Sequence, residues 1–159
     1  MNEWMQVILE TIWLLLPAGV ANTVPVVAAK YNWLPPLNKP IHIQLLGQNK
    51  TWRGVIIGVI FGSITGIFLG HGLVFGAALG FGALAGDAVK SFFKRRLKIA
   101  PGKSWPVFDQ IDFVLGALIA ASFFVSLTLL HVVTALIIFT MLSLATSFIG
   151  MKLKIKKSL

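Results

Sequence analysis

Five long apolar segments, separated by short polar ones, dominate the pattern of hydrophobic and polar positions along this chain. They cover about residues 4–29, 54–70, 72–89, 113–130 and 132–150. A helix needs about 20 mostly apolar residues to cross a bilayer, and each segment approaches that length. The pattern predicts an all-α integral membrane protein with five transmembrane helices in a single membrane domain, residues 1–159.

The first apolar segment contains Pro17 and Pro25, and Glu10 is its only charged residue. No basic residues precede it, and it is long for the apolar core of a signal peptide, so we predict a membrane helix there. Glu10 has two equal interpretations: a functional acid within the membrane, or a solvated residue near the outer interface. We therefore leave Glu10 outside the predicted site.

All fourteen basic residues lie in the polar segments between or after the predicted helices. Cytoplasmic loops of membrane proteins are enriched in lysine and arginine, and a five-helix arrangement places all fourteen on one side. We therefore expect a plasma-membrane protein with its N-terminus outside and its C-terminus in the cytoplasm. Its cytoplasmic loops would be residues 30–53 and 90–112.

The composition narrows the kinds of site that this chain can hold. Apolar residues make up 57% of the chain and charged residues 12%, which excludes an ordinary soluble domain. Cysteine is absent, and the three histidines (His42, His71 and His131) show no ligand spacing, so no thiolate or zinc site is predicted. The formal charge of +9 lies beside the membrane segments, where it indicates orientation and lipid contact and not nucleic-acid binding.

Glycine recurs at every fourth position from Gly54 to Gly70 and again from Gly72 to Gly80. Four-residue steps place these glycines on one stripe of a helix, where two backbones can approach closely. A nucleotide-binding glycine loop is the alternative, but glycines inside a membrane segment mostly serve packing. Only His71 and its flanking glycines separate the two segments, which predicts a tight helical hairpin.

The three aspartates of the chain lie at the ends of two predicted helices. Asp87 is near the end of the third helix, and Asp109 and Asp112 are three residues apart at the start of the fourth, so those two carboxylates should point together. Oxygen ligands without sulfur or histidine suit Mg²⁺. The alternative is that each aspartate only pairs with a nearby lysine or arginine; three acids at one membrane rim favour the metal. The candidate catalytic residues are Asp87, Asp109, Asp112 and Lys94, and the three aspartates are the candidate metal ligands.

Basic and hydroxyl residues near these aspartates are candidates for binding phosphate. Lys90, Ser91 and Lys94 follow Asp87 at helical spacing and should share its face. Residues 47–54, GQNKTWRG, enter the second predicted helix, whose N-terminus offers free N–H groups to an anion. That motif is weak alone, because lysine and arginine at a helix end also set its orientation. The candidate phosphate-binding residues are Lys50, Thr51, Arg53, Lys90, Ser91 and Arg95.

These motifs resemble those of the CTP:phosphatidate cytidylyltransferase superfamily, which includes the CDP-diacylglycerol synthases. Residues 86–95 match the pattern G-D-x-x-x-S-x-x-K-R, residues 101–102 match a proline and glycine in the following loop, and residues 109–112 match D-R-x-D except for Gln110. Residues 48–54 match most of the upstream pattern S-P-G-K-T-W-x-G. The K-D-x-G and H-G-G elements of the superfamily are missing.

A short, five-helix chain with N-K-T-x-R-G, K-S-x-x-K-R and D-Q-x-D-F is more similar to the CDP-archaeol synthase branch. This resemblance implies a Mg²⁺-dependent enzyme that transfers CMP from CTP to an ether-linked, isoprenoid glycerol-phosphate lipid in the bilayer and releases pyrophosphate. It implies a cytoplasm-facing site open sideways to lipid, with the aspartates holding Mg²⁺ and the basic residues contacting the triphosphate and the lipid phosphate.

Two other classes stay open at this stage. A small transporter or channel component would use buried acids along an ion path, whereas these acids gather at one rim. A non-catalytic membrane assembly or lipid-binding protein would present a basic face to anionic headgroups, but that face has no need of three carboxylates. No motif decides between isoprenoid and diacyl chains, or the oligomeric state.

Overall fold

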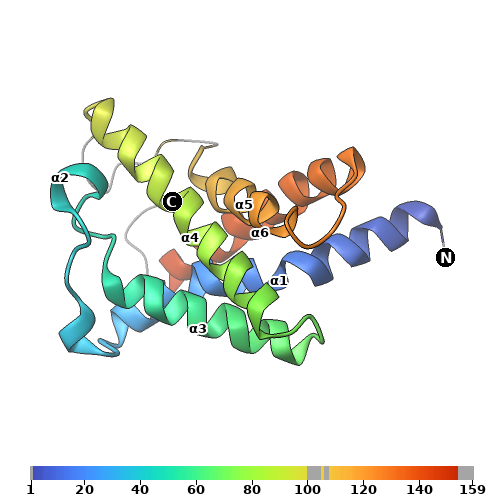
Figure 1. Cartoon of the computed structure of the whole chain (residues 1–159). Coiled ribbons are helices and arrows are strands. Elements are labelled where there is room, and N and C mark those ends of the chain that lie inside the picture. Colours follow the sequence, from blue (N-terminus) through green and yellow to red (C-terminus); the bar gives the residue numbers. More distant parts are fainter. Residues whose placement is uncertain (1, 100–104, 106–107, 154–159) are drawn as a thin grey trace.

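A computed structural model describes residues 2–99, 105 and 108–153, and within these residues the chain is helical (Figure 1). The predicted loop residues Pro101 and Gly102 and the lysines beyond residue 153 lie outside the described residues. Only an isolated bridge between Pro40 and Thr51 pairs extended backbone in the described part. The helices are α1 (Glu3–Lys30), the 3₁₀ turn η1 (Pro35–Leu37), α2 (Ile43–Leu46), α3 (Trp52–Phe68), α4 (Leu73–Arg96), α5 (Phe108–Ala121) and α6 (Leu129–Lys152).

Three of these helices, α1, α4 and α6, are long and apolar enough to cross a bilayer, and α3 is a shorter apolar helix. Large apolar side chains cover their outer surfaces, among them Phe68, Phe81 and Met141. Exposed apolar surface on this scale is typical of a protein that faces lipid. The prediction of an all-helical, multi-pass membrane protein is confirmed at this level.

Two helix boundaries differ from the predicted ones. The helix expected to end near Val89 continues to Arg96, and the three basic residues of its last turn complement the negative end of the helix dipole. The predicted helix 113–130 is wrong as one element, because α5 ends at Ala121 and α6 begins at Leu129. Thr128 caps α6 in a capping box with His131, so His131 lies in the first turn of α6 and not in a connecting turn.

The glycine stripes pack α3 against α4, as predicted. A Cβ atom at Gly62 would lie 2.9 Å from the carbonyl oxygen of Gly76 and 3.1 Å from Cα of Gly80, so a larger residue would force the helices apart. Gly70 and Gly72 adopt φ angles of +79° and +87° in the connection, which L residues with side chains rarely adopt. The tight hairpin around His71 is therefore confirmed.

A second glycine contact joins α4 to α5. A Cβ atom at Gly86 would lie 3.2 Å from Cα of Gly116 and would also meet the carbonyl group of Asp112. A Cβ atom at Gly82 would lie 2.6 Å from the carbonyl oxygen of Gly116. The backbones of α4 and α5 therefore touch beside Asp87, and this contact brings the two aspartate-bearing helix ends together.

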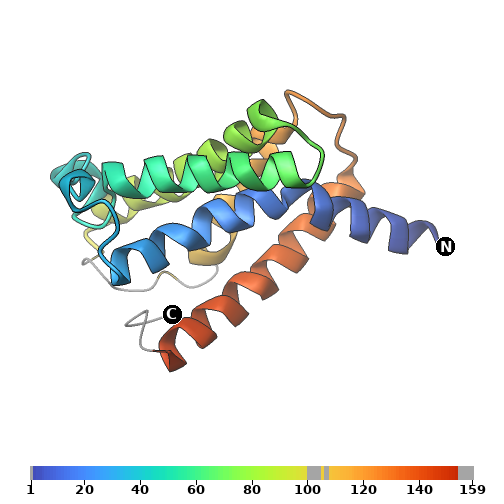
Figure 2. The same ribbon diagram turned by 90° about the horizontal axis from the view of Figure 1, so that it is seen from below.

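The ends of five helices gather at one end of the molecule. Figures 1 and 2 show the C-terminal ends of α1, α4 and α6 and the N-terminal ends of α3 and α5 at that end, together with α2. Lys30 Nζ donates a hydrogen bond of 3.1 Å to the carbonyl oxygen of Leu153, which links the ends of α1 and α6. The apolar core lies further along the bundle, where Leu15, Leu79 and Val114 are almost fully buried.

Candidate functional site

The three aspartates converge on a single ammonium group, that of Lys90. Lys90 Nζ lies 2.9 Å from Oδ1 of Asp87, 3.2 Å from Oδ1 of Asp109 and 2.7 Å from Oδ2 of Asp112. Their side chains are only 7–21% exposed. The structure thus brings together three carboxylates that are far apart in the sequence, since Asp109 follows Asp87 by 22 residues and Asp112 follows Asp109 by 3.

Two further lysines flank this cluster. Lys50, which directly precedes the N-cap of α3, forms an ion pair with Oδ2 of Asp87. Lys94 lies one turn beyond Lys90 on α4 and donates to both oxygens of Asp109, at 3.0 and 3.1 Å. Three aspartates therefore face three lysines in one partly buried cluster, and the interaction of opposite charges is strong where water is largely excluded.

Two helices, α4 and α5, supply the side chains of this cluster other than Lys50. Asp87, Lys90 and Lys94 follow one another at intervals of three and four residues, so α4 presents them on one face. Asp109 and Asp112 lie in the first part of α5 on a common face. The backbone N–H of Trp105 donates to Oδ2 of Asp109 at 2.5 Å, which fixes this carboxylate at the start of the helix.

Asp109 and Asp112 precede the apolar part of α5, and their environments differ. Burial alone would raise the pKa of Asp109, but the Trp105 N–H and the ammonium groups of Lys94 and Lys90 outweigh it and hold that pKa below its usual value. Burial and the negative charge of Asp87 raise the pKa of the Asp112 carboxyl to about 6, against the attraction of Lys90. Asp112 is therefore the carboxylate of this pair that most needs a compensating cation.

Three predicted phosphate-binding residues make other contacts. Thr51 is the N-cap of α3, and its hydroxyl oxygen accepts from the N–H of Gly54 at 3.2 Å. Arg53 is buried and donates to Oδ1 of Asn32 at 3.2 Å and to the carbonyl oxygen of Trp33 at 3.3 Å. Ser91 donates its hydroxyl to the Asp87 carbonyl oxygen at 2.9 Å. No hydrogen bond or ion pair joins these three side chains to a carboxylate of the described residues.

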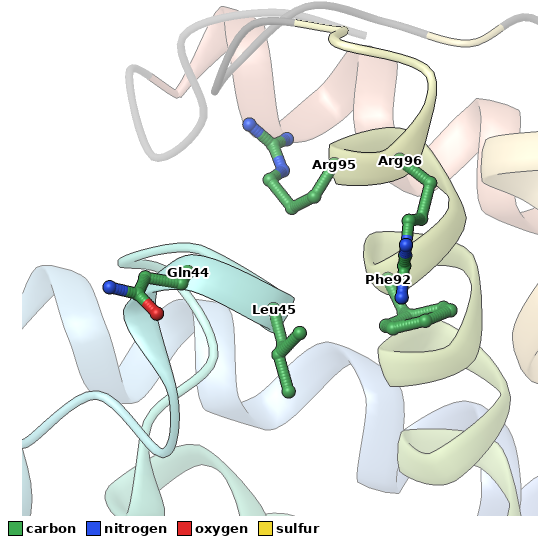
Figure 3. A pocket seen from close by; sticks show the side chains of 5 residues that line it. All are labelled: Gln44, Leu45, Phe92, Arg95 and Arg96. Carbon is green, nitrogen blue, oxygen red and sulfur yellow. The ribbon is translucent and has the colours of Figure 1, made fainter.

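Arg95 lies beside a small cavity of about 90 Å³ between α2 and α4. Figure 3 shows Arg95 extending from α4 toward α2, while Arg96 folds over the ring of Phe92, with its Cζ 5.2 Å from the ring centre. Nε of Arg95 is buried and has no hydrogen-bond partner within the described part of the chain. Arg95 therefore keeps donor capacity for an anion beside this cavity.

The chemistry of the donor set suits a magnesium ion, although no three His, Cys, Asp or Glu side chains in the described residues are arranged as a metal site. Each carboxylate directs one oxygen at the position of the Lys90 ammonium, so these oxygens already surround a cation. Carboxylate oxygens without sulfur or imidazole are the ligands that Mg²⁺ prefers. Asp87, Asp109 and Asp112 would hold such an ion.

Two features that position the site were missed at the level of sequence. The Trp105 N–H cannot be assigned to Asp109 from a motif, although a carboxylate close to a helix start often accepts from the backbone. The contact at Gly116 could have been predicted, because Gly82, Gly86 and Gly116 are small residues on the two helices that carry the aspartates, and small residues favour close helix packing.

Comparisons with known proteins agree on one family. Residues 4–159 match the family described as CarS-like, CDP-archaeol synthase. A CDP-archaeol synthase of Aeropyrum pernix is 43% identical over 121 residues, covering 70% of this chain and 68% of that protein. A CDP-archaeol synthase of Pyrobaculum aerophilum is 33% identical over 153 residues, covering 91% of this chain and 93% of that protein.

A solved structure of an intramembrane enzyme for archaeal membrane lipids biosynthesis has a similar fold. It is 35% identical in sequence, with a TM-score of 0.77 over 89% of this chain and 94% of that chain. Similarity at this level extends over most of the fold.

Proposed function

The chain belongs to the CDP-archaeol synthase family, and from this premise we propose that it transfers CMP from CTP to a glycerol-phosphate lipid with ether-linked isoprenoid chains. The products are a CDP-lipid and pyrophosphate. The observation that carries this proposal is the convergence of three carboxylates from α4 and α5 on one cation position. A lipid cytidylyltransferase must neutralise a triphosphate at the edge of the membrane, and this cluster lies at the gathered helix ends (Figure 1).

The reaction needs positioning and charge neutralisation more than proton transfer. An oxygen of the lipid phosphate forms a bond to the α-phosphorus of CTP, and the bond from that phosphorus to the oxygen bridging to the β-phosphate breaks. Pyrophosphate leaves with that bonding pair. Because the attacking phosphate oxygen is already negative, no strong general base is required, and electrostatic stabilisation supplies most of the rate.

The side chains of the cluster divide this work. Asp87, Asp109 and Asp112 would hold Mg²⁺, which, when bound, neutralises the triphosphate and stabilises the charge on the leaving pyrophosphate. Lys90 and Lys94 face the same point from α4 and neutralise phosphate oxygens. Further phosphate contacts are proposed for Lys50, which belongs to the cluster, and for Thr51, Arg53, Ser91 and Arg95.

The proposed position in the plasma membrane follows from the charges at the helix ends. The described basic residues at the ends of α1, α4 and α6 and before α3 gather at the same end as the aspartates (Figures 1 and 2). Five crossings with the N-terminus outside would place this end in the cytoplasm, where CTP is available. A lipid phosphate at the inner surface would then reach the cluster from the side.

The test uses the purified full-length protein in detergent with CTP and one of two lipids: ether-linked isoprenoid glycerol phosphate or diacyl phosphatidate. Pyrophosphate release is followed with Mg²⁺ and with excess EDTA. We expect Mg²⁺-dependent release that is faster with the isoprenoid lipid. Absence of release with both lipids, from protein that is folded by its melting curve, would contradict the proposal.

A further inference from the structure

Lys90 occupies the place that the proposed function assigns to a metal ion. Its Nζ lies 2.7–3.2 Å from one oxygen of each of the three carboxylates. The two flanking lysines contact one carboxylate each, Lys50 that of Asp87 and Lys94 that of Asp109. Of the lysines in the described cluster, Lys90 is therefore the one that holds all three carboxylates together.

A magnesium ion and this ammonium group exclude each other from that place. Magnesium takes oxygen ligands at about 2.0–2.1 Å, and the same oxygens now surround the Lys90 nitrogen. Two cations this close also repel each other strongly, since the side chains of Lys90 and Asp112 are only 13% and 7% exposed. Metal binding to the three carboxylates therefore requires Lys90 to leave them.

The geometry points to Lys90 as an exchangeable counter-ion: its ammonium keeps the three carboxylates together until the metal nucleotide arrives, and then moves onto the phosphates that come with the metal. This inference rests on the proposed function and adds a step to it. Lysine suits the step because a compact ammonium on a flexible four-carbon stem can move by several ångströms while its helix stays in place.

The exchange explains why a site for a divalent cation is lined by lysines. In the metal-free protein, three carboxylates within reach of one another would repel, and removing a partner from a buried ion pair is strongly destabilising. Lys90 relieves this repulsion and keeps the carboxylate oxygens close to their positions for the metal. The same ammonium also competes with a bare metal ion for the carboxylates. A metal ion that carries phosphates should bind better than the ion alone, because the phosphates accept the lysine that the metal displaces.

The test measures binding of Mn²⁺, a paramagnetic probe for Mg²⁺, to the full-length protein without nucleotide or lipid. Lys90→Met removes the competing ammonium and keeps the length of the side chain. Lys94→Met is the matched control, because it removes the same charge from the same face of α4 but leaves the ammonium between the carboxylates. Mn²⁺ affinity is read from the electron paramagnetic resonance of the free ion.

We expect Lys90→Met to bind Mn²⁺ at least about tenfold more tightly than both the wild type and Lys94→Met, which is the order by which one neighbouring charge shifts an ionic equilibrium. We expect the metal-free Lys90→Met protein to melt at least about 5 °C lower than the wild type, with Mn²⁺ restoring the loss. With Mn²⁺ saturating, Lys90→Met should bind CTP more weakly than the wild type, because the variant has no ammonium at this position to contact the phosphates.

Equal or weaker Mn²⁺ affinity in Lys90→Met, relative to Lys94→Met, would overturn the exchange. If Lys90→Met folds only in the presence of metal and Lys94→Met folds without it, that difference supports the exchange, and Lys90→Gln then supplies the affinity measurement. Wild-type CMP transfer together with unchanged Mn²⁺ affinity in Lys90→Met would refute the exchange and the phosphate role of Lys90, and would leave the proposed CMP transfer standing. Absence of Mn²⁺ binding in all the proteins would refute the exchange together with the metal site of the proposed function.

Discussion

The contact between Gly86 of α4 and the backbone of α5 offers the sharpest test of how the fold builds the site. In Gly86→Ala, the added Cβ atom would lie 3.1 Å from the carbonyl carbon of Asp112 and 3.2 Å from Cα of Gly116, and nearest of all to the Asp112 carbonyl oxygen. These are backbone atoms, which cannot rotate away. The two helices must therefore move apart by several tenths of an ångström to about 1 Å.

That displacement acts directly on the carboxylates. Asp87 follows Gly86 on α4, and Asp112 belongs to the contacted turn of α5, so the distance between their carboxylates grows with the helix separation. Magnesium demands near-ideal octahedral geometry, and a misplacement of about 1 Å can reduce catalysis by about 100-fold. Alanine is a better helix former than glycine by about 1 kcal/mol, so α4 itself should still form.

The assay compares Gly86→Ala with Gly19→Ala in CTP- and lipid-dependent pyrophosphate release, Mn²⁺ binding and thermal unfolding. The control adds the same methyl group to α1, where its nearest neighbours are ring atoms of Phe139 at 3.4 and 3.8 Å, an ordinary contact. We expect Gly86→Ala to lose about 100-fold in activity and about tenfold or more in Mn²⁺ affinity, and Gly19→Ala to stay near the wild type. Activity of Gly86→Ala within about threefold of the wild type would refute the role of this contact.

Three other substitutions test individual side chains. Asp112→Asn should give folded protein with at least about 100-fold less activity, the order of loss on removing one electrostatic stabiliser; near-normal turnover would remove Asp112 from the metal site. Lys94→Ala should raise the KM for CTP or for the lipid by at least about tenfold, since a hydrogen bond to a charged group contributes about 1.5–3 kcal/mol; unchanged kinetics for both substrates would contradict its phosphate role. Thr51→Ala should lower the free energy of unfolding by about 1 kcal/mol through loss of the α3 cap, and Thr51→Ser should restore it; equal stability of the two variants would argue against the capping role.

Local patterns in the sequence were enough to predict the helices and part of their packing. Hydropathy located an apolar helix in each predicted segment, and the four-residue glycine spacing predicted the contact of α3 with α4. The spacing of Asp87, Lys90 and Lys94 predicted that they share a face, because residues three and four apart on a helix are neighbours whatever the rest of the fold does. The family motifs then connected this face with Asp109 and Asp112.

Hydropathy failed where an apolar stretch is not helical. Residues 122–128 are apolar enough to continue α5, yet the helix ends at Ala121 and a capped helix begins after Thr128. Hydropathy measures whether a segment is compatible with lipid. It does not measure whether that segment forms a helix. The capping box of Thr128 and His131 was the local signal for this break. It was missed in the sequence because His131 was interpreted as a turn residue and not as a capping partner.

The tertiary structure decided which charges meet. Lys90 could have paired with any of several acids or faced the lipid headgroups, and its place between three carboxylates depends on the approach of α4 to α5 at Gly86 and Gly116. Arg53 follows Lys50 by three residues, yet its guanidinium turns to Asn32 and Trp33 while Lys50 reaches Asp87. The sequence alone located the apolar segments that form helices and the chemistry that they carry, because both depend on near neighbours in the chain. The charge pairs were left to the fold, because they depend on distances between helices that no local pattern encodes.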